Sequence, residues 1–178
     1  FAGAQTLSTT AGGALTGIDA VLADAGWITG TVTGPEGQPL YAARAWVYDS
    51  GGTYVTGTYT LGDGTYRLGG IAASGNYSVR FRPPSGVGYA IEWYNDKRWS
   101  GAADAVSVTV GAETPSINAQ LEYGGSISGD VTDAASGLPI ANVAVSGRDE
   151  ANVVIFSDTT DAAGHYDLYW VPACNVKL

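Results

Sequence analysis

One stretch of this sequence occurs twice, and that repeat limits the possible folds more than any other feature. GWITGTVTGPEGQPLYAA at 26–43 returns as GSISGDVTDAASGLPIANV at 125–143. Aligning Ile28 with Ile127 gives an offset of 99 residues, and one inserted residue near Ser136 lengthens the offset by one. A period of this length predicts tandem copies of one domain, each of ordinary domain size.

The repeat also extends in front of the first copy. TLSTTAGGALTGIDAVLADAG at 6–26 aligns with AVSVTVGAETPSINAQLEYGG at 105–125, and their apolar residues coincide. The coinciding pairs are Leu7 with Val106, Ile18 with Ile117, Ala20 with Ala119, and Leu22 with Leu121. We therefore expect three units: the C-terminal strands of a repeat at 1–25, a complete repeat at 26–124, and the N-terminal part of a further repeat at 125–178.

Apolar and polar residues alternate in short runs along the whole chain. Examples are WITGTVT at 27–33, YSVRF at 77–81 and INAQL at 117–121. Such alternation is typical of a strand with one buried and one exposed face. Turn sequences rich in Gly, Asp and Pro separate the runs. The sequence predicts an all-β fold of tandem antiparallel β-sandwiches, with less than about a tenth of the residues in helix.

Composition excludes several classes of partner. The chain has 17 acidic and 8 basic residues, a net charge of -9 and no Lys/Arg cluster, so we expect no nucleic-acid partner. No apolar run approaches the roughly 20 residues of a membrane helix, so we expect no membrane insertion in this segment. The single cysteine, Cys174, excludes an internal disulfide and a Cys-based zinc site. We expect it to be an unpaired thiol, with an intermolecular link as the alternative.

The sequence offers no catalytic, cofactor-binding or metal-binding constellation. His165 is the only histidine, and it lies in the turn AAGHYD where the first repeat has Thr65. A general base needs a cleft and an oriented partner, so we interpret His165 as an ordinary turn residue. Three further carboxylates, Asp158, Asp161 and Asp167, lack the alternating spacing of a calcium loop, and we expect them to be solvated. The sequence therefore predicts a protein that is not an enzyme and needs no metal or cofactor.

An aromatic stretch, IEWYNDKRW at 91–99, is open to two interpretations. Trp93, Tyr94 and Trp99 lie close together in it, with Lys97 and Arg98 between them. Exposed rings beside polar groups are suited to stacking on a sugar or contacting a partner subunit. Packing explains the same rings and is the interpretation that we favour: Trp93 and Tyr94 alternate between the core and the surface of a strand, and Trp99 covers the edge.

The two long copies resemble the carboxypeptidase regulatory-like domain. The residues that carry the resemblance are a G-x-V-x-D/G opening, a G-x-P-L/I turn, an aspartate that closes the second strand, and a G-x-Y-x-L strand. That family is part of the wider group of prealbumin-like, Ig-like sandwiches that includes the collagen-adhesin B-type repeats of bacterial or archaeal surface proteins. The resemblance implies an extracellular, non-catalytic building block at the cell surface.

Some adhesin relatives form an internal isopeptide bond from a lysine on the first strand. The corresponding stretches here, 27–33 and 126–132, contain no lysine. We therefore predict that this chain forms no such bond.

Two functions remain on these grounds. The first is a structural repeat that forms a cell-surface stalk or filament for adhesion, with copies of itself or adjacent repeats as partners. The second is an accessory module of a larger secreted protein that binds carbohydrate or protein through Trp93, Tyr94 and Trp99. Binding to a glycan array that is lost in Trp99→Ala would favour the second.

The last unit stops inside a strand, because Leu178 aligns with Val79. Two explanations fit. Either the sequence is a window of a longer tandem array, or the strands at 1–25 of one protomer complete the unit at 125–178 of the next by strand addition. Such a head-to-tail contact does not close and produces a fibre, a homo-oligomer of open length. In both cases we expect Leu7, Ile18, Ala20 and Leu22 to pack on a unit of the 125–178 type and not in the central core.

Overall fold

The computed structural model describes residues 6–149, 152–173 and 175–178. It is 44% strand and 2% helical, which confirms the all-β prediction. The one helical element in the described part is a single 3-10 turn, η1 (Ser100–Ala102). None of the described helical segments has the length and hydropathy needed to cross a bilayer.

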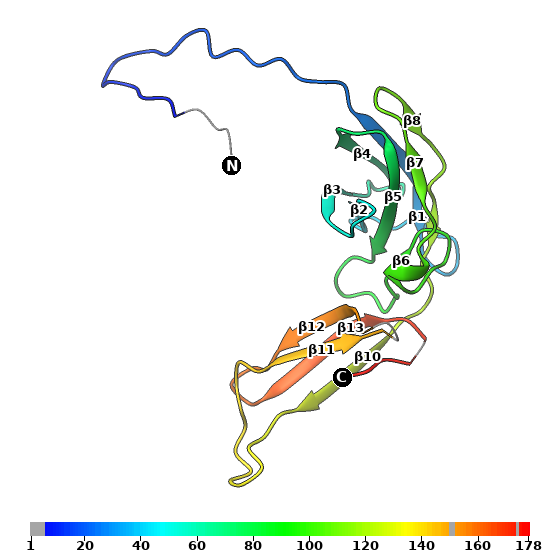
Figure 1. Cartoon of the computed structure of the whole chain (residues 1–178). Coiled ribbons are helices and arrows are strands. Elements are labelled where there is room, and N and C mark those ends of the chain that lie inside the picture. The colour runs from blue at the N-terminus through cyan, green and yellow to red at the C-terminus, as the bar shows by residue number, and fades with distance from the viewer. Residues whose placement is uncertain (1–5, 150–151, 174) are drawn as a thin grey trace.

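Residues 26–124, which we call the central unit, fold into a sandwich of two sheets (Figure 1). The first sheet contains β1 (Gly26–Thr33), β4 (Thr65–Ile71), β8 (Glu113–Thr114) and β9 (Ala119–Gln120). The second contains β2 (Arg44–Tyr48), β3 (Tyr54–Tyr59), β5 (Gly75–Arg82), β6 (Glu92–Trp93) and β7 (Val106–Val108). The inward residues of the alternating runs meet between the sheets, and there they form the core.

Four strands supply most of this core. Ile28 and Val32 of β1, Val79 and Phe81 of β5, Leu68 of β4 and Val108 of β7 are all fully or almost fully buried. The last buried residue along the unit is Leu121, which is not exposed at all. The alternation read from the sequence thus places one face of each strand in the core.

Two strand pairs in the first sheet are parallel, which the antiparallel prediction did not include. Trp27 and Ile28 of β1 pair with β8, and Val32 and Thr33 pair with β9. The first and last strands of the unit become neighbours because the chain passes through β2 to β7 and then crosses from β7 back to the edge of β1. Parallel neighbours require such a crossover, whereas a hairpin always gives an antiparallel pair.

Residues 125–178, which we call the C-terminal unit, form two strand pairs. They are β10 (Gly125–Asp130) with β13 (His165–Val171), and β11 (Ala144–Arg148) with β12 (Val154–Thr159). Each pair reproduces the register of its counterpart in the central unit: Ile28 lies opposite Leu68, and Ile127 lies opposite Leu168. The equal registers agree with the alignment of the two segments, while the 99-residue repeat length stays a prediction.

A buried threonine performs the same task in both units. The N–H of Ala43 donates to Thr60 Oγ1 at 2.9 Å, and the N–H of Val143 donates to Thr160 Oγ1 at 2.9 Å. Both threonine side chains are almost wholly buried, so each hydroxyl satisfies a backbone group that water does not reach.

Residues 6–24 form neither helix nor strand and lie outside the core (Figure 1). All of their side chains are exposed; Ile18 is 59% and Leu22 is 88% accessible. The segment does not take the place of 105–121 in the central core. Whether it packs on a C-terminal unit stays a prediction.

Candidate functional site

In the central unit, β1 pairs with β4 along one edge, and the C-terminal residues of the same unit cover its other edge. The N–H of Ile117 donates to Thr29 O at 3.0 Å, and the N–H of Leu121 donates to Thr33 O at 2.8 Å. The N–H of Thr31 donates to the side-chain oxygen of Asn118 at 2.9 Å. The residues from Ile117 to Leu121 therefore satisfy the backbone of β1 and close the sandwich on this side.

Gly30 and Tyr66 make the close approach of this segment possible. A Cβ added at Gly30 would lie 2.1 Å from the carbonyl oxygen of Ile117, so no larger residue fits there. The hydroxyl of Tyr66 donates to the same carbonyl oxygen at 2.6 Å. Tyr66 is only 3% exposed, and this burial raises the pKa of its phenol far above the usual range.

The equivalent edge of β10 is unpaired within the described residues. Along Gly125–Asp130 the strand pairs only with β13, and the C-terminal unit contains no residue equivalent to Ile117. At Gly129, the counterpart of Gly30, an added Cβ would approach only the Tyr166 side chain, 2.8 Å from its hydroxyl oxygen. The edge of β10 thus has the same glycine and tyrosine as that of β1, and no described residue covers them as Ile117 does in the central unit.

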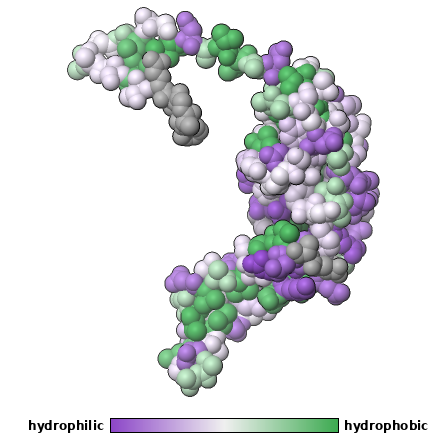
Figure 2. All heavy atoms as spheres, in the orientation of Figure 1, coloured by the Kyte–Doolittle hydropathy of each residue, from purple (hydrophilic) through white to green (hydrophobic). Residues whose placement is uncertain are grey.

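The inner face of the C-terminal unit is also incompletely covered. Its buried cluster is small and consists of Phe156, Leu168 and Val171 together with Ile91 of the central unit. The partly buried residues packed against this cluster are Ile127, Val145, Ile155, Tyr166, Trp170 and Val176. Figure 2 shows apolar side chains gathered on the visible face of this unit. An open apolar face beside an unpaired edge is typical of an association surface.

A cavity of about 420 Å³ separates part of the two units. Arg80 and Arg82 enter it from β5, and Asp158, Asp167 and Trp170 line the opposite wall. The Arg80 guanidinium donates to Ile155 O at 3.3 Å, and the Arg82 guanidinium lies 4.8 Å from the centre of the Trp170 ring. These contacts hold the C-terminal unit against the outer face of the second sheet.

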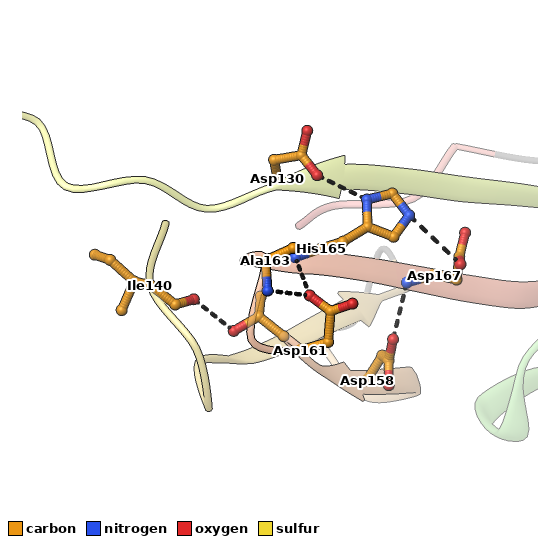
Figure 3. Close-up of polar contacts among 8 residues, drawn as sticks. Asp130, Ile140, Asp158, Asp161, Ala163, His165 and Asp167 are labelled. Atoms are coloured by element: carbon orange, nitrogen blue, oxygen red, sulfur yellow. Dashed lines mark hydrogen bonds and ion pairs between the residues drawn. The ribbon is translucent and has the colours of Figure 1, made fainter. Parts of the chain in front are cut away.

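His165 lies between two carboxylates, an arrangement that the sequence analysis missed (Figure 3). Its Nδ1 is 2.7 Å from Asp130 Oδ1, and its Nε2 is 3.5 Å from Asp167 Oδ2. The hydrogen bond with Asp130 raises the pKa of His165 above its ordinary value of 6.5, and the Asp167 charge adds to this effect. The pairing of β10 with β13 brings Asp130 opposite His165, so only the sheet register could have indicated this contact.

The neighbouring aspartates hold turns and strand ends. Asp161 accepts hydrogen bonds from the N–H of Ala163 at 2.8 Å and from the N–H of His165 at 2.9 Å. Asp158 accepts one from the N–H of Asp167 at 2.8 Å, which lowers the pKa of Asp158. Among the residues that the structure describes, no three His, Cys, Asp or Glu side chains are grouped as metal ligands would be. Cys174 lies outside the described residues.

The aromatic stretch is mostly packed. Trp93 is 8% exposed and lies 5.2 Å from the Tyr48 ring, and Tyr94 packs against the central core. Trp99 is partly buried beside η1, and Lys97 forms an ion pair with Asp104 at 3.7 Å. Trp93 therefore offers little surface for stacking, and a glycan contact at these residues stays a prediction.

Glu92, next to Trp93, is a buried carboxyl group that the sequence analysis did not single out. It is 7% exposed and lines a small space of about 60 Å³ at the junction with Pro172 of the C-terminal unit. Burial raises the pKa of Glu92 to about 8, and the charges of Asp96 and Glu122 act in the same direction. Strict alternation along a strand would expose Glu92 beside the buried Trp93. Both residues of β6 are in fact buried, so the alternating pattern did not indicate the burial of Glu92.

Residues 27–122 match the carboxypeptidase regulatory-like domain. The chain belongs to this family. The carboxypeptidase regulatory-like match begins in β1 and ends just after β9, so it includes the parallel pairs of β1 with the end of the unit. No curated protein matches the sequence.

Several solved structures resemble this carboxypeptidase regulatory-like chain at low identity. The Bacillus anthracis TIE protein is 18% identical, with a TM-score of 0.39, and the match covers 81% of this chain and 26% of that protein. GBS52, the minor pilin of Streptococcus agalactiae, is 16% identical, with a TM-score of 0.41, over 58% of this chain and 46% of that one. BcpA, the major pilin subunit of Bacillus cereus, is 10% identical, with a TM-score of 0.33, over 83% and 85%. The chain thus spans half or less of the length of the first two.

Proposed function

We propose that this chain is a non-catalytic structural module of an extracellular surface appendage, in which sandwich units are joined end to end as a stalk or filament. One observation carries the proposal. Within the described residues, β10 has an unpaired edge and the C-terminal unit has an open apolar face, while residues 6–24 are exposed and resemble the segment that covers the equivalent edge in the central unit. The likeness between residues 6–24 and the segment that covers β1 supports head-to-tail association of copies by strand addition.

The charged residues near the open face support this function over a catalytic one. His165 contacts Asp130 and Asp167, and the described contacts place no hydroxyl or thiol nucleophile against it. The nearby aspartates accept backbone hydrogen bonds that hold turns. These groups are explained by the stability of the C-terminal unit, without a substrate.

The test is the association state of the full chain. We expect the mass measured by light scattering to rise with protein concentration, and negative-stain images to show linear particles. A chain that stays monomeric at all accessible concentrations would overturn the head-to-tail part of the proposal. Surface labelling of the producing cells with an antibody against this chain tests the location separately, and label confined to the cell interior would contradict it.

A second proposal is glycan binding by the aromatic stretch. The observation in its favour is that Tyr94 and Trp99 keep part of their surface accessible beside the exposed Arg98. Trp99→Ala tests it, because this substitution should abolish binding to a glycan array and leave the association of copies unchanged. Equal glycan signals from both proteins, or none from either, would dismiss it.

A further inference from the structure

We infer that the cavity between the two units is a binding site for an acidic sugar, whose carboxylate is held by Arg80 and Arg82. The site is separate from the glycan contact proposed above, because Tyr94 and Trp99 do not line this cavity. Its volume of about 420 Å³ lies in the range of small-molecule sites in proteins.

The first argument is a group of three arginines around one indole ring. The guanidinium carbons of Arg44, Arg80 and Arg82 lie 4.8, 5.5 and 5.3 Å from the centre of the Trp46 ring. The pairing of β2 with β5 sets Arg82 opposite Arg44. It also sets Arg80 opposite the tryptophan, so all of these side chains lie on the outer face of the second sheet. Like charges gathered at one ring repel one another, and a bound anion offsets that repulsion.

The second argument is that no described carboxylate neutralises these arginines. The ion pairs of the described residues have Lys97 and His165 as their only cations. The Nε atoms of Arg80 and Arg82 are buried and contact no acceptor in the described part of the chain. Buried donors of this kind are normally satisfied by protein, water or a bound ion. In a chain with a net charge of -9, arginines without a carboxylate partner favour an external anion.

The third argument is the opposite wall, which can accept hydrogen bonds from sugar hydroxyl groups. Asp158 and Asp167 line it. The N–H of Asp167 donates to Asp158 Oδ2 at 2.8 Å, and Asp167 Oδ2 lies 3.5 Å from His165 Nε2, so both carboxylates are held in place. A carboxylate accepts several hydrogen bonds, so each can also receive a ligand hydroxyl. Guanidinium groups on one wall and carboxylates on the other select a ligand with a carboxylate at one end and hydroxyl donors at the other.

Aromatic rings complete the lining. Trp46 and Trp170 line the cavity from the central and the C-terminal unit. The Trp46 ring lies against Gly57 of β3, where an added Cβ would be 2.6 Å from its Cδ1 atom, so this glycine provides the room for the ring. Apolar ring surface beside charged groups suits a sugar better than a simple anion, which has no C–H face to pack.

The cavity lies away from the edges at which the central unit adds its later strands. In that unit β3 and β4 are the outer strands of their sheets, whereas β5 pairs with β2, and β8 and β9 pair with β1. The cavity is lined by the counterparts of the outer strands, β12 and β13. Further strands added on the same plan would lie beside β10 and β11, and the cavity would keep its lining.

The first experiment compares matched ligands on the full chain. Galacturonate and glucuronate carry a carboxylate where galactose and glucose carry a hydroxymethyl group, and acetate supplies the carboxylate alone. Binding is followed by NMR through the indole N–H signal of Trp46, assigned with Trp46→Phe. We expect at least one of the two acids to bind at least tenfold more tightly than its neutral sugar and than acetate.

The second experiment tests the arginines. Arg82→Gln and Arg80→Gln should each weaken binding of the acid at least tenfold, and Arg82→Lys should weaken it less, because the charge stays while the planar pair of N–H donors is lost. Arg67→Gln is the matched control: Arg67 lies 4.7 Å from the Trp27 ring on the other sheet and does not line the cavity, so binding should not change. Unchanged NMR signals elsewhere in the spectrum show that each variant is folded.

The contrary outcomes are distinct from those of the proposed function. No shift with either acid, equal affinity for an acid and its neutral sugar, or full affinity in both glutamine variants would overturn the inference. Acetate that binds as tightly as the acids would overturn the sugar as the ligand. Binding lost in Trp99→Ala and kept in Arg82→Gln would place the ligand at the aromatic stretch instead. None of these results changes the association measured by light scattering, on which the head-to-tail proposal depends.

Discussion

Glu92 is a buried carboxyl group whose ionisation opposes folding. Its pKa in the folded chain is about 8 against an ordinary value of 4.5, so the folded state binds this proton more tightly than the unfolded state does. Its contribution to stability is complete below pH 4.5 and is lost as the pH rises through 8. The buried carboxyl at the junction therefore makes the fold sensitive to mild alkali.

Glu92→Gln should remove that sensitivity. The shift of the pKa corresponds to on the order of 4 kcal/mol between acid and alkaline pH. We expect urea denaturation to show wild type losing stability between pH 5 and pH 9 relative to the glutamine variant, with the two nearly equal at pH 5. Glu122→Gln is the control, because Glu122 is exposed and should leave most of the difference in place. Equal pH profiles for wild type and Glu92→Gln would contradict the assignment.

His165 differs from Glu92 because it is exposed and its ring contacts two carboxylates, those of Asp130 and Asp167. Its raised pKa means that its contact with Asp130 stabilises the fold below pH 6.5 and that this contribution is lost as the pH rises through the folded value. Because it is the only histidine, its ring proton resonance can be followed by NMR without assignment. We expect a midpoint above 6.5 in wild type and a lower one in Asp130→Asn. An unchanged midpoint would mean that Asp130 is not the cause.

At the scale of strands, the sequence predicts where the strands lie but not which distant strands pair. Alternation and turns placed the strands, because burial of one face is a local property. The parallel pairing of β1 with β9, and the contact of His165 with Asp130, depend on which distant strands become neighbours. Glu92 was missed for the same reason: its burial comes from the junction between units, not from its own strand.

The paired glycines offer a test at this scale. Gly30→Ala forces a methyl group into the Ile117 carbonyl oxygen, and we expect it to lower the free energy of unfolding of the chain by about 3 kcal/mol. Gly129→Ala, at the equivalent place on β10, should change it by less than about 1 kcal/mol in dilute solution. Chemical denaturation of both variants below the association range makes the comparison. Similar losses from both would show that the two edges do not differ as described.

At the scale of the whole molecule, the described strands of the two units follow the same plan. Their strand pairs have equal registers, and Thr60 and Thr160 satisfy equivalent backbone groups. The central unit gains its closed core from the residues after η1, which return to the edge of β1. The described strands of the C-terminal unit pair as their counterparts do, so its open face does not come from a different packing of these strands.

The parallel arrangement of β1 and β9 has a mechanical consequence. Tension along the chain enters β1 at Gly26 and leaves the unit beyond Gln120, so the two neighbouring strands are pulled at opposite ends. The hydrogen bonds and side-chain contacts between β1 and β9 are then loaded together in shear. They must break together and cannot open one after another. In single-molecule pulling of the full chain, we expect the central unit to rupture in one high-force event and the C-terminal unit to open earlier at low force. A gradual, low-force extension of both would show that the load passes through the chain along a different path.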